Sequence, residues 1–148
     1  GQLVIGGEAE AVTKASELAL EKGARRAIPL NTSGPFHTEL LAPASNELKE
    51  KFVSVNFNEM QVPVIFNSSA KELESGVSIA QMLEKQVMSS VYFEDSIRYM
   101  LENGVDTIIE IGPGKVLSGF IRKIDKTIKT YQVEDQASLE KTLMGVKG

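Results

Sequence analysis

The sequence predicts an α/β fold in which a mostly parallel sheet is covered by helices on both faces. The main observation is that strand-like and helix-like hydrophobic patterns alternate along the chain, as they do in parallel α/β proteins. The length of 148 residues suits one domain of ordinary size. With 42% hydrophobic and 24% charged residues, the composition is near the globular average, which argues against intrinsic disorder.

The beginning of the chain is expected to form one β-α-β unit. Residues 2–5, Gln-Leu-Val-Ile, are followed by a pair of glycines, which predicts a short strand. Residues 8–22 repeat apolar side chains with a helical period, and Gly23 is a typical helix stop. Residues 24–30 predict a second strand, and its proline restricts it to a sheet edge or to a strand end.

A loop and a helix follow. Residues 31–37 have the composition of a loop, and apolar side chains then recur on one face over residues 38–53. Pro43 fits that helix only in its first turn or at a kink. Residues 62–66 form a short apolar run bounded by polar residues, which predicts a buried strand.

Two more helices are predicted in the middle of the chain. Ser78 and Gln81 match a capping box, which opens a helix through about residue 87. Residues 92–103 have a helical apolar stripe that includes Phe93, and Gly104 ends it.

The last third of the chain gives the clearest alternation of strands and helices. The expected elements are a strand, a helix, a strand and a helix, over residues 105–111, 115–124, 127–133 and 136–145. Asp135 can cap the last helix. The loop Gly112–Lys115 lies between strand and helix, where α/β folds bind phosphate, but it lacks the spacing of a P-loop. A tight turn that needs glycine is the favoured interpretation.

Composition excludes several classes of function. The chain has no cysteine, which rules out disulfides, cysteine-bound metals and a cysteine nucleophile. A single histidine rules out multi-histidine metal sites, so no metal is expected. A net charge of -4 argues against nucleic acid as a partner. No apolar run reaches the roughly 20 residues that span a bilayer, and no signal peptide is evident. A cytoplasmic protein without a membrane or nucleic-acid partner is expected.

His37 is the one imidazole and the first candidate for catalysis. It follows a Gly-Pro turn, where a loop can direct a side chain into a cleft. Imidazole both accepts and releases protons near neutral pH. The alternative is a structural or merely exposed histidine. No serine of the chain lies in a Gly-x-Ser-x-Gly context, so a partner nucleophile is missing.

Five motifs in order resemble one known family. They are Gly1-Gln2-Leu3-Val4-Ile5, Arg25-x-x-x-Pro29-Leu30, Ser33-Gly34-Pro35-Phe36-His37, Leu40-Leu41-x-Pro43-Ala44 and Glu110-Ile111-Gly112-Pro113-Gly114-Lys115-Val116-Leu117. In order and spacing these motifs resemble the malonyl-CoA:acyl-carrier-protein transacylases of bacterial fatty acid synthesis. The resemblance covers only the C-terminal half of that family.

The resemblance implies an α/β-hydrolase-like acyltransferase domain that carries a ferredoxin-like small subdomain. Residues 1–35 would be the C-terminal half of the small subdomain, and residues 36–148 the C-terminal part of the large domain. The family's first half, which carries the serine nucleophile, would be absent. We therefore expect this chain to be a fragment without turnover of its own.

The resemblance also assigns roles to three residues. His37 matches the catalytic histidine of a ping-pong acyl transfer in which a serine carries the malonyl group. A backbone carbonyl at a glutamine orients that histidine in the family, and Gln86, seven residues before Phe93, fits that position. Phe36 resembles the bulky residue of malonyl-selective members, which predicts malonyl over methylmalonyl.

The expected partners are malonyl-CoA and the acyl carrier protein, with the coenzyme A thioester as substrate and no resident cofactor. A basic cluster over residues 115–129 would suit an acidic carrier protein. A different class of function stays open: a stand-alone scaffold that binds carrier protein without catalysis. A polyketide-type acyltransferase of other specificity is a third. Strand 2–5 would lack partners, which predicts self-association through this truncated edge.

Overall fold

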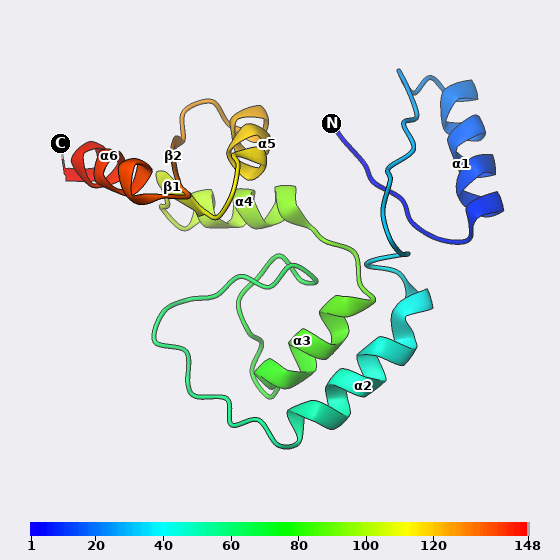
Figure 1. The fold of residues 1–148 in the computed structure, drawn as a ribbon, viewed down its shortest axis with the longest axis horizontal. Helices are drawn as coiled ribbons and strands as arrows, with labels where there is room; N and C mark the ends of the chain where they lie inside the picture. The colour runs from blue at the N-terminus through cyan, green and yellow to red at the C-terminus, as the bar shows by residue number, and fades with distance from the viewer. Residues whose placement is uncertain (148) are drawn as a thin grey trace. The chain divides into compact units, whose positions relative to one another are not determined.

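The computed structural model describes residues 1–147 and divides the chain into two compact units, Gly1–Val91 and Tyr92–Gly148. Helices and parallel strands are both present in the described residues, so the expected α/β class is confirmed (Figure 1). The expected subdomain boundary falls after residue 35, while compactness divides the chain after Val91. These are different properties, and the boundary at residue 35 stays a prediction.

The first unit is helical with long irregular connections. Its elements are α1 (Ala9–Glu21), the short 3-10 helix η1 (Glu39–Leu41), α2 (Ala42–Phe52) and α3 (Ile79–Val87). Gly23 follows α1 with a φ of 96°, which is the left-handed conformation expected after a helix end. The predicted capping box of α3 is confirmed. The Ser78 N–H donates a 2.8 Å hydrogen bond to the side-chain oxygen of Gln81, and the Gln81 N–H donates a 3.2 Å hydrogen bond to the Ser78 hydroxyl oxygen.

Helices α2 and α3 pack side by side and form the centre of this unit (Figure 1). Pro43 lies in the first turn of α2, as the sequence requires. The α3 side chain Met82 is buried, and Ser45 of α2 is 1% exposed. The Ser45 hydroxyl donates a 2.9 Å hydrogen bond to the carbonyl oxygen of Glu84, so the two helices share a polar contact as well as apolar ones.

Three predicted strands of the first unit are wrong. Residues 2–5, 24–30 and 62–66 are irregular in the structure, apart from one bridge between Phe66 and Lys71. A strand persists only when a neighbour pairs with its backbone, and residues 1–91 contain no such ladder. Apolar side chains in these segments are accordingly exposed to solvent; Leu3, for example, is 88% exposed.

The second unit has the predicted alternation. It consists of α4 (Phe93–Glu102), β1 (Thr107–Ile111), α5 (Val116–Ile124), β2 (Lys129–Val133) and α6 (Gln136–Lys147). The two strands pair in parallel, with Thr107 opposite Lys129 and Ile111 opposite Val133. Asp135 caps α6 as predicted, since its carboxylate accepts a 2.8 Å hydrogen bond from the Ser138 N–H.

A small apolar core holds the second unit together. Ile97 of α4, Ile121 of α5 and Ile128 are buried, and the partly buried side chains packed on them are Phe93, Met100, Leu101, Ile108 and Ile124. Val116 and Leu117, although apolar, are both exposed and do not join this core. They lie in the first turn of α5, while the buried side of the helix begins at Ser118.

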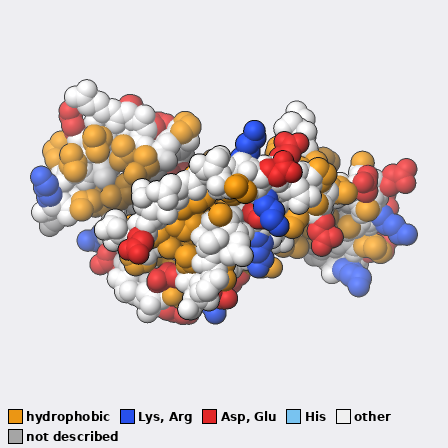
Figure 2. All heavy atoms as spheres, turned by 90° about the horizontal axis from the view of Figure 1, so that it is seen from below, with side chains coloured by type: hydrophobic (Ala, Val, Ile, Leu, Met, Phe, Trp, Pro, Cys, Tyr) orange, Lys and Arg blue, Asp and Glu red, His pale blue; other side chains and the backbone are white. Residues whose placement is uncertain are grey.

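One face of the second unit leaves apolar side chains open. Ile109 and Ile111 of β1 are exposed, the second by 83%, and so is Met144 of α6. Figure 2 shows hydrophobic side chains at the surface of the molecule. Parallel strands normally have both faces covered. The sheet also has only two strands among the described residues, fewer than the sequence pattern predicted.

None of the helices in the described part of the chain is both long and apolar enough to cross a bilayer.

Candidate functional site

His37 lies in a tight turn just before η1 and is exposed. Its φ of 62° places a residue other than glycine in the left-handed region, which costs roughly 1–2 kcal/mol. The next residue closes the turn, because the Thr38 hydroxyl donates a 2.7 Å hydrogen bond to the Pro35 carbonyl. Strain of this kind persists where surrounding contacts hold it, often at functional sites.

The structure brings His37 and Gln86 together. The Nδ1 atom of His37 lies 3.2 Å from the backbone carbonyl oxygen of Gln86. A carbonyl oxygen only accepts hydrogen bonds, so this contact assigns the ring proton of the neutral form to Nδ1. The Nε2 atom then keeps its lone pair and can accept a proton from a substrate or a nucleophile.

The carbonyl that meets His37 is available because α3 ends there. The last four carbonyl groups of an α-helix have no partner within the helix. Gln86 is the second-last residue of α3, and its oxygen also receives the Ser89 N–H at 3.4 Å.

Phe36 precedes His37, and its side chain is 55% exposed. The ring folds back over Gly34, where an added Cβ would lie 3.8 Å from it. An added Cβ on Gly6 would lie 3.0 Å from the Thr38 methyl group, so the N-terminal segment passes close to this turn. Phe36 therefore borders His37 with an open aromatic face, and its predicted role in selectivity stays a prediction.

The surroundings of the His37 ring are open to solvent. Within residues 1–147 no side-chain hydroxyl is hydrogen-bonded to His37. Two open depressions on the first unit, one along α1 and one around residues 60–73, do not include it. In the part of the chain that the structure describes, no group of three or more His, Asp or Glu side chains could hold a metal ion. Within the described residues, the structure orients the His37 ring through its Nδ1 atom.

The loop Gly112–Lys115 is a structural turn. The Glu110 carboxylate on β1 accepts hydrogen bonds from the N–H groups of Leu117 and Ser118 and from the Ser118 hydroxyl, at 2.6–3.1 Å. An anion thus already occupies the N-terminus of α5, where a phosphate would have to bind. The hydrogen bond from the Ser118 hydroxyl, with those from the two backbone N–H groups, holds the pKa of Glu110 below its ordinary value.

The contact that joins helices α2 and α3 near His37 was not predicted from the sequence. Ser45 is four residues after Leu41 and three before Leu48, on the face predicted to be apolar. A serine on such a face is the available signal, because a buried hydroxyl needs a partner. That partner, the Glu84 carbonyl, is 39 residues away and is visible only in the structure.

Two curated relatives match the chain over nearly its whole length. The malonyl CoA-acyl carrier protein transacylase of Bacillus subtilis (strain 168) is 47% identical over 147 residues, which is 99% of this chain and 46% of the relative. That of Escherichia coli (strain K12) is 35% identical over 143 residues, which is 97% of this chain and 46% of the relative. The chain thus spans about half the length of the curated relatives it matches. No family model matches.

Solved structures give the same result. A malonyl CoA-acyl carrier protein transacylase from Clostridium perfringens superposes with a TM-score of 0.90 at 42% identity, over 95% of this chain and 44% of that one. An MCAT from Streptococcus pneumoniae superposes with a TM-score of 0.88 at 50% identity, over 94% of this chain and 45% of that one. The resemblance seen in the five motifs is confirmed in sequence and in fold.

Proposed function

We propose that this chain, similar over almost all of its length to about half of a malonyl CoA-acyl carrier protein transacylase, provides the histidine-bearing half of such an enzyme. The observation that carries the proposal is the 3.2 Å contact between His37 Nδ1 and the Gln86 carbonyl. Motif resemblance had paired these two residues across 49 positions. The contact leaves Nε2 free, as an acyl transfer through a serine requires.

The first half-reaction would load the enzyme. His37 Nε2 takes the proton of a serine hydroxyl, and the serine oxygen attacks the thioester carbonyl of malonyl-CoA. The C–S bond breaks, and the imidazolium returns its proton to the coenzyme A thiolate that leaves. The product is a malonyl ester on the serine. That serine would belong to the part of the protein that this chain does not cover.

The second half-reaction would unload it. Nε2 takes the proton of the phosphopantetheine thiol of the carrier protein, and the sulfur attacks the malonyl ester. The C–O bond breaks, and the serine oxygen regains the proton from the imidazolium. His37 ends each half-reaction in its starting state, with the Gln86 carbonyl holding the same ring orientation throughout.

Phe36 would set the acyl specificity. A phenyl ring beside the histidine crowds an α-methyl branch, so malonyl is preferred over methylmalonyl. One methyl group in such a pocket is worth only about 1–3 kcal/mol, or roughly 10- to 200-fold.

The remaining part of the protein would complete the fold. Residues 1–35 would be half of a ferredoxin-like subdomain and residues 36–148 part of a hydrolase-like domain. The irregular segments 2–5 and 24–30 would then pair with strands outside this chain. Support comes from their apolar, exposed side chains, of which Leu3 and Ile28 are examples.

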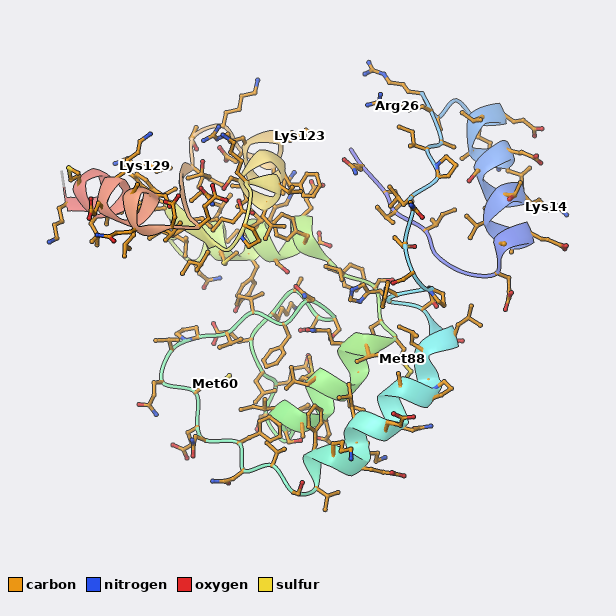
Figure 3. All side chains as sticks on the ribbon, viewed as in Figure 1. Lys14, Arg26, Met60, Met88, Lys123 and Lys129 are labelled. Carbon is orange, nitrogen blue, oxygen red and sulfur yellow. The ribbon has the colours of Figure 1, made fainter. Side chains whose placement is uncertain are left out.

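Acyl carrier protein would be the second substrate. One matching structure, 35% identical with a TM-score of 0.88, is described as a type II PKS acyl-carrier protein in complex with its malonyl-transacylase. On this chain the basic cluster includes Lys123 and Lys129, both labelled in Figure 3. Charge complementarity with an acidic carrier protein would speed the encounter.

A chimera tests the proposal. The matching half of the Bacillus subtilis enzyme is replaced by this chain, and malonyl transfer from coenzyme A to carrier protein is measured. The chimera is expected to be active, and His37→Ala to lower kcat by about 10²-fold or more, as losing a general base does. Ser54→Ala, an exposed change outside the site, is the control. A chimera whose kcat is indifferent to His37→Ala would refute the role.

A further inference from the structure

Two side chains from the α2 side of the first unit meet the same turn of α3. Ser45 Oγ donates to the Glu84 carbonyl at 2.9 Å, and His37 Nδ1 donates to the Gln86 carbonyl at 3.2 Å. The two carbonyls are two residues apart, about 3 Å along the helix axis. Both lie in the last turn of α3, where carbonyl groups have no partner within the helix.

The two contacts differ in burial. Ser45 is 1% exposed, whereas His37 is exposed and lies in a turn. A solvent-facing hydrogen bond competes with water and orders a loop side chain only weakly. A buried one has no such competitor, because the carbonyl would otherwise be left unpaired. The hydrogen bond of Ser45 is therefore the stronger constraint on how α2 lies against the end of α3.

The chain between the two residues is short and stiff. The Thr38 hydroxyl donates a hydrogen bond to the Pro35 carbonyl, and the Leu41 N–H donates one to the Thr38 carbonyl at 3.0 Å. Helix α2 begins directly after Leu41. Met88, labelled in Figure 3, directly follows α3 and marks the helix end that receives both contacts. A shift of α2 along α3 would therefore move His37 relative to Gln86.

Lys49 does not provide the same constraint. It lies one turn after Ser45, and its Nζ is 3.9 Å from the Glu84 carboxylate. The lysine side chain is 68% exposed, and exposed ion pairs contribute little. Lys49 contacts the same residue of α3 from the solvent side, which makes it a matched control.

We propose that Ser45 is a positioning residue that sets the distance between the His37 ring and the Gln86 carbonyl, and thereby selects the Nδ1–H tautomer. The Ser45 hydroxyl acts through the backbone of Glu84 and touches no substrate. The proposal rests on the proposed role of His37 only for its effect on turnover, since the tautomer is a property of the chain itself.

The test is ¹⁵N NMR of the His37 ring in the 148-residue chain, at a pH where the ring is neutral. The two nitrogens report the tautomer directly, and the chain has only one histidine. The unaltered chain is expected to show mainly Nδ1–H. Ser45→Ala is expected to lower the ratio of Nδ1–H to Nε2–H by about 2- to 10-fold, which corresponds to one hydrogen bond of ordinary net strength.

Lys49→Met and Ser54→Ala are the controls and are expected to leave the ratio unchanged. Circular dichroism checks that each variant keeps its helices. If Ser45→Ala loses its helices, Ser45→Cys is used in its place, because cysteine has nearly the size of serine but is a weaker hydrogen-bond donor. A folded Ser45 variant with the ratio of the unaltered chain would overturn the inference. That result would leave the role of His37 in the chimera untouched.

Discussion

At the scale of single residues, His37 combines three properties. Its backbone is left-handed, its ring is exposed, and its Nδ1 atom is bonded to a carbonyl 49 residues away. An exposed ring with one nitrogen held and the other open is the arrangement that the proposed proton transfer requires.

Glu110 gives a prediction on pH. Its folded-state pKa is lowered by hydrogen bonds from Ser118 and Leu117, so its carboxylate stabilises the fold above the unfolded value of about 4.3. That stability is lost as the pH falls through the lowered folded-state pKa. Glu110→Gln cannot titrate, so its stability is expected to fall less between pH 5 and about pH 3.

The measurement is urea unfolding of both chains across that pH range. Thr13→Val on α1, which alters an exposed hydroxyl far along the chain, is a control for general effects of acid. Parallel pH curves for Glu110→Gln and the unaltered chain would mean that this carboxylate contributes nothing.

At the scale of elements, two glycines in helices predict opposite results. An added Cβ at Gly119 of α5 meets nothing within 4 Å, while at Gly145 of α6 it would lie 2.5 Å from the Tyr131 ring. Gly119→Ala is expected to raise the free energy of unfolding by about 0.5–1 kcal/mol through helix propensity. Gly145→Ala is expected to lower it by about 1 kcal/mol, because overpacking outweighs the same gain.

Chemical denaturation of both variants checks this pair. The Tyr131 hydroxyl also donates to the Gly145 carbonyl at 2.7 Å, so a displaced α6 would lose that bond too. Equal stabilisation by both alanines would show that the Tyr131 ring of β2 does not lie against Gly145 of α6.

The elements also show what a sequence can and cannot predict. The helices were predictable because their signals are local: the Ser78 capping box and the stop at Gly104 lie within or beside the helices they bound. Residues 2–5 and 24–30 have strand-like composition but no neighbour to pair with among residues 1–91. A strand depends on a partner that its own sequence does not contain.

The same distinction holds at the site. His37 and Gln86 were paired through motif resemblance, and the structure brings them together. The contact of Ser45 with the Glu84 carbonyl was not foreseen, because no side-chain pattern marks a backbone acceptor. The phosphate-site alternative for Gly112–Lys115 could be decided only when Glu110 was found at the helix N-terminus.

At the scale of the whole molecule, the open apolar segments predict self-association. Residues 2–5 and 24–30 present exposed apolar side chains and belong to no sheet among residues 1–91, which invites pairing with another chain. Sedimentation of the 148-residue chain is expected to show species larger than a monomer, increasing with concentration. A monomer at all concentrations, with full hydrogen-exchange protection of residues 1–30, would contradict this.

We propose that this chain brings the histidine of a serine–histidine acyl transfer, with the serine outside the chain. Intact-mass spectrometry after incubation with malonyl-CoA tests it most directly, on the isolated chain and on the chimera with the Bacillus subtilis half. We expect one malonyl group on the chimera and none on the isolated chain, which also transfers none to carrier protein. A malonyl adduct on the isolated 148-residue chain, or transfer by it, would refute the proposed division of the serine and the histidine.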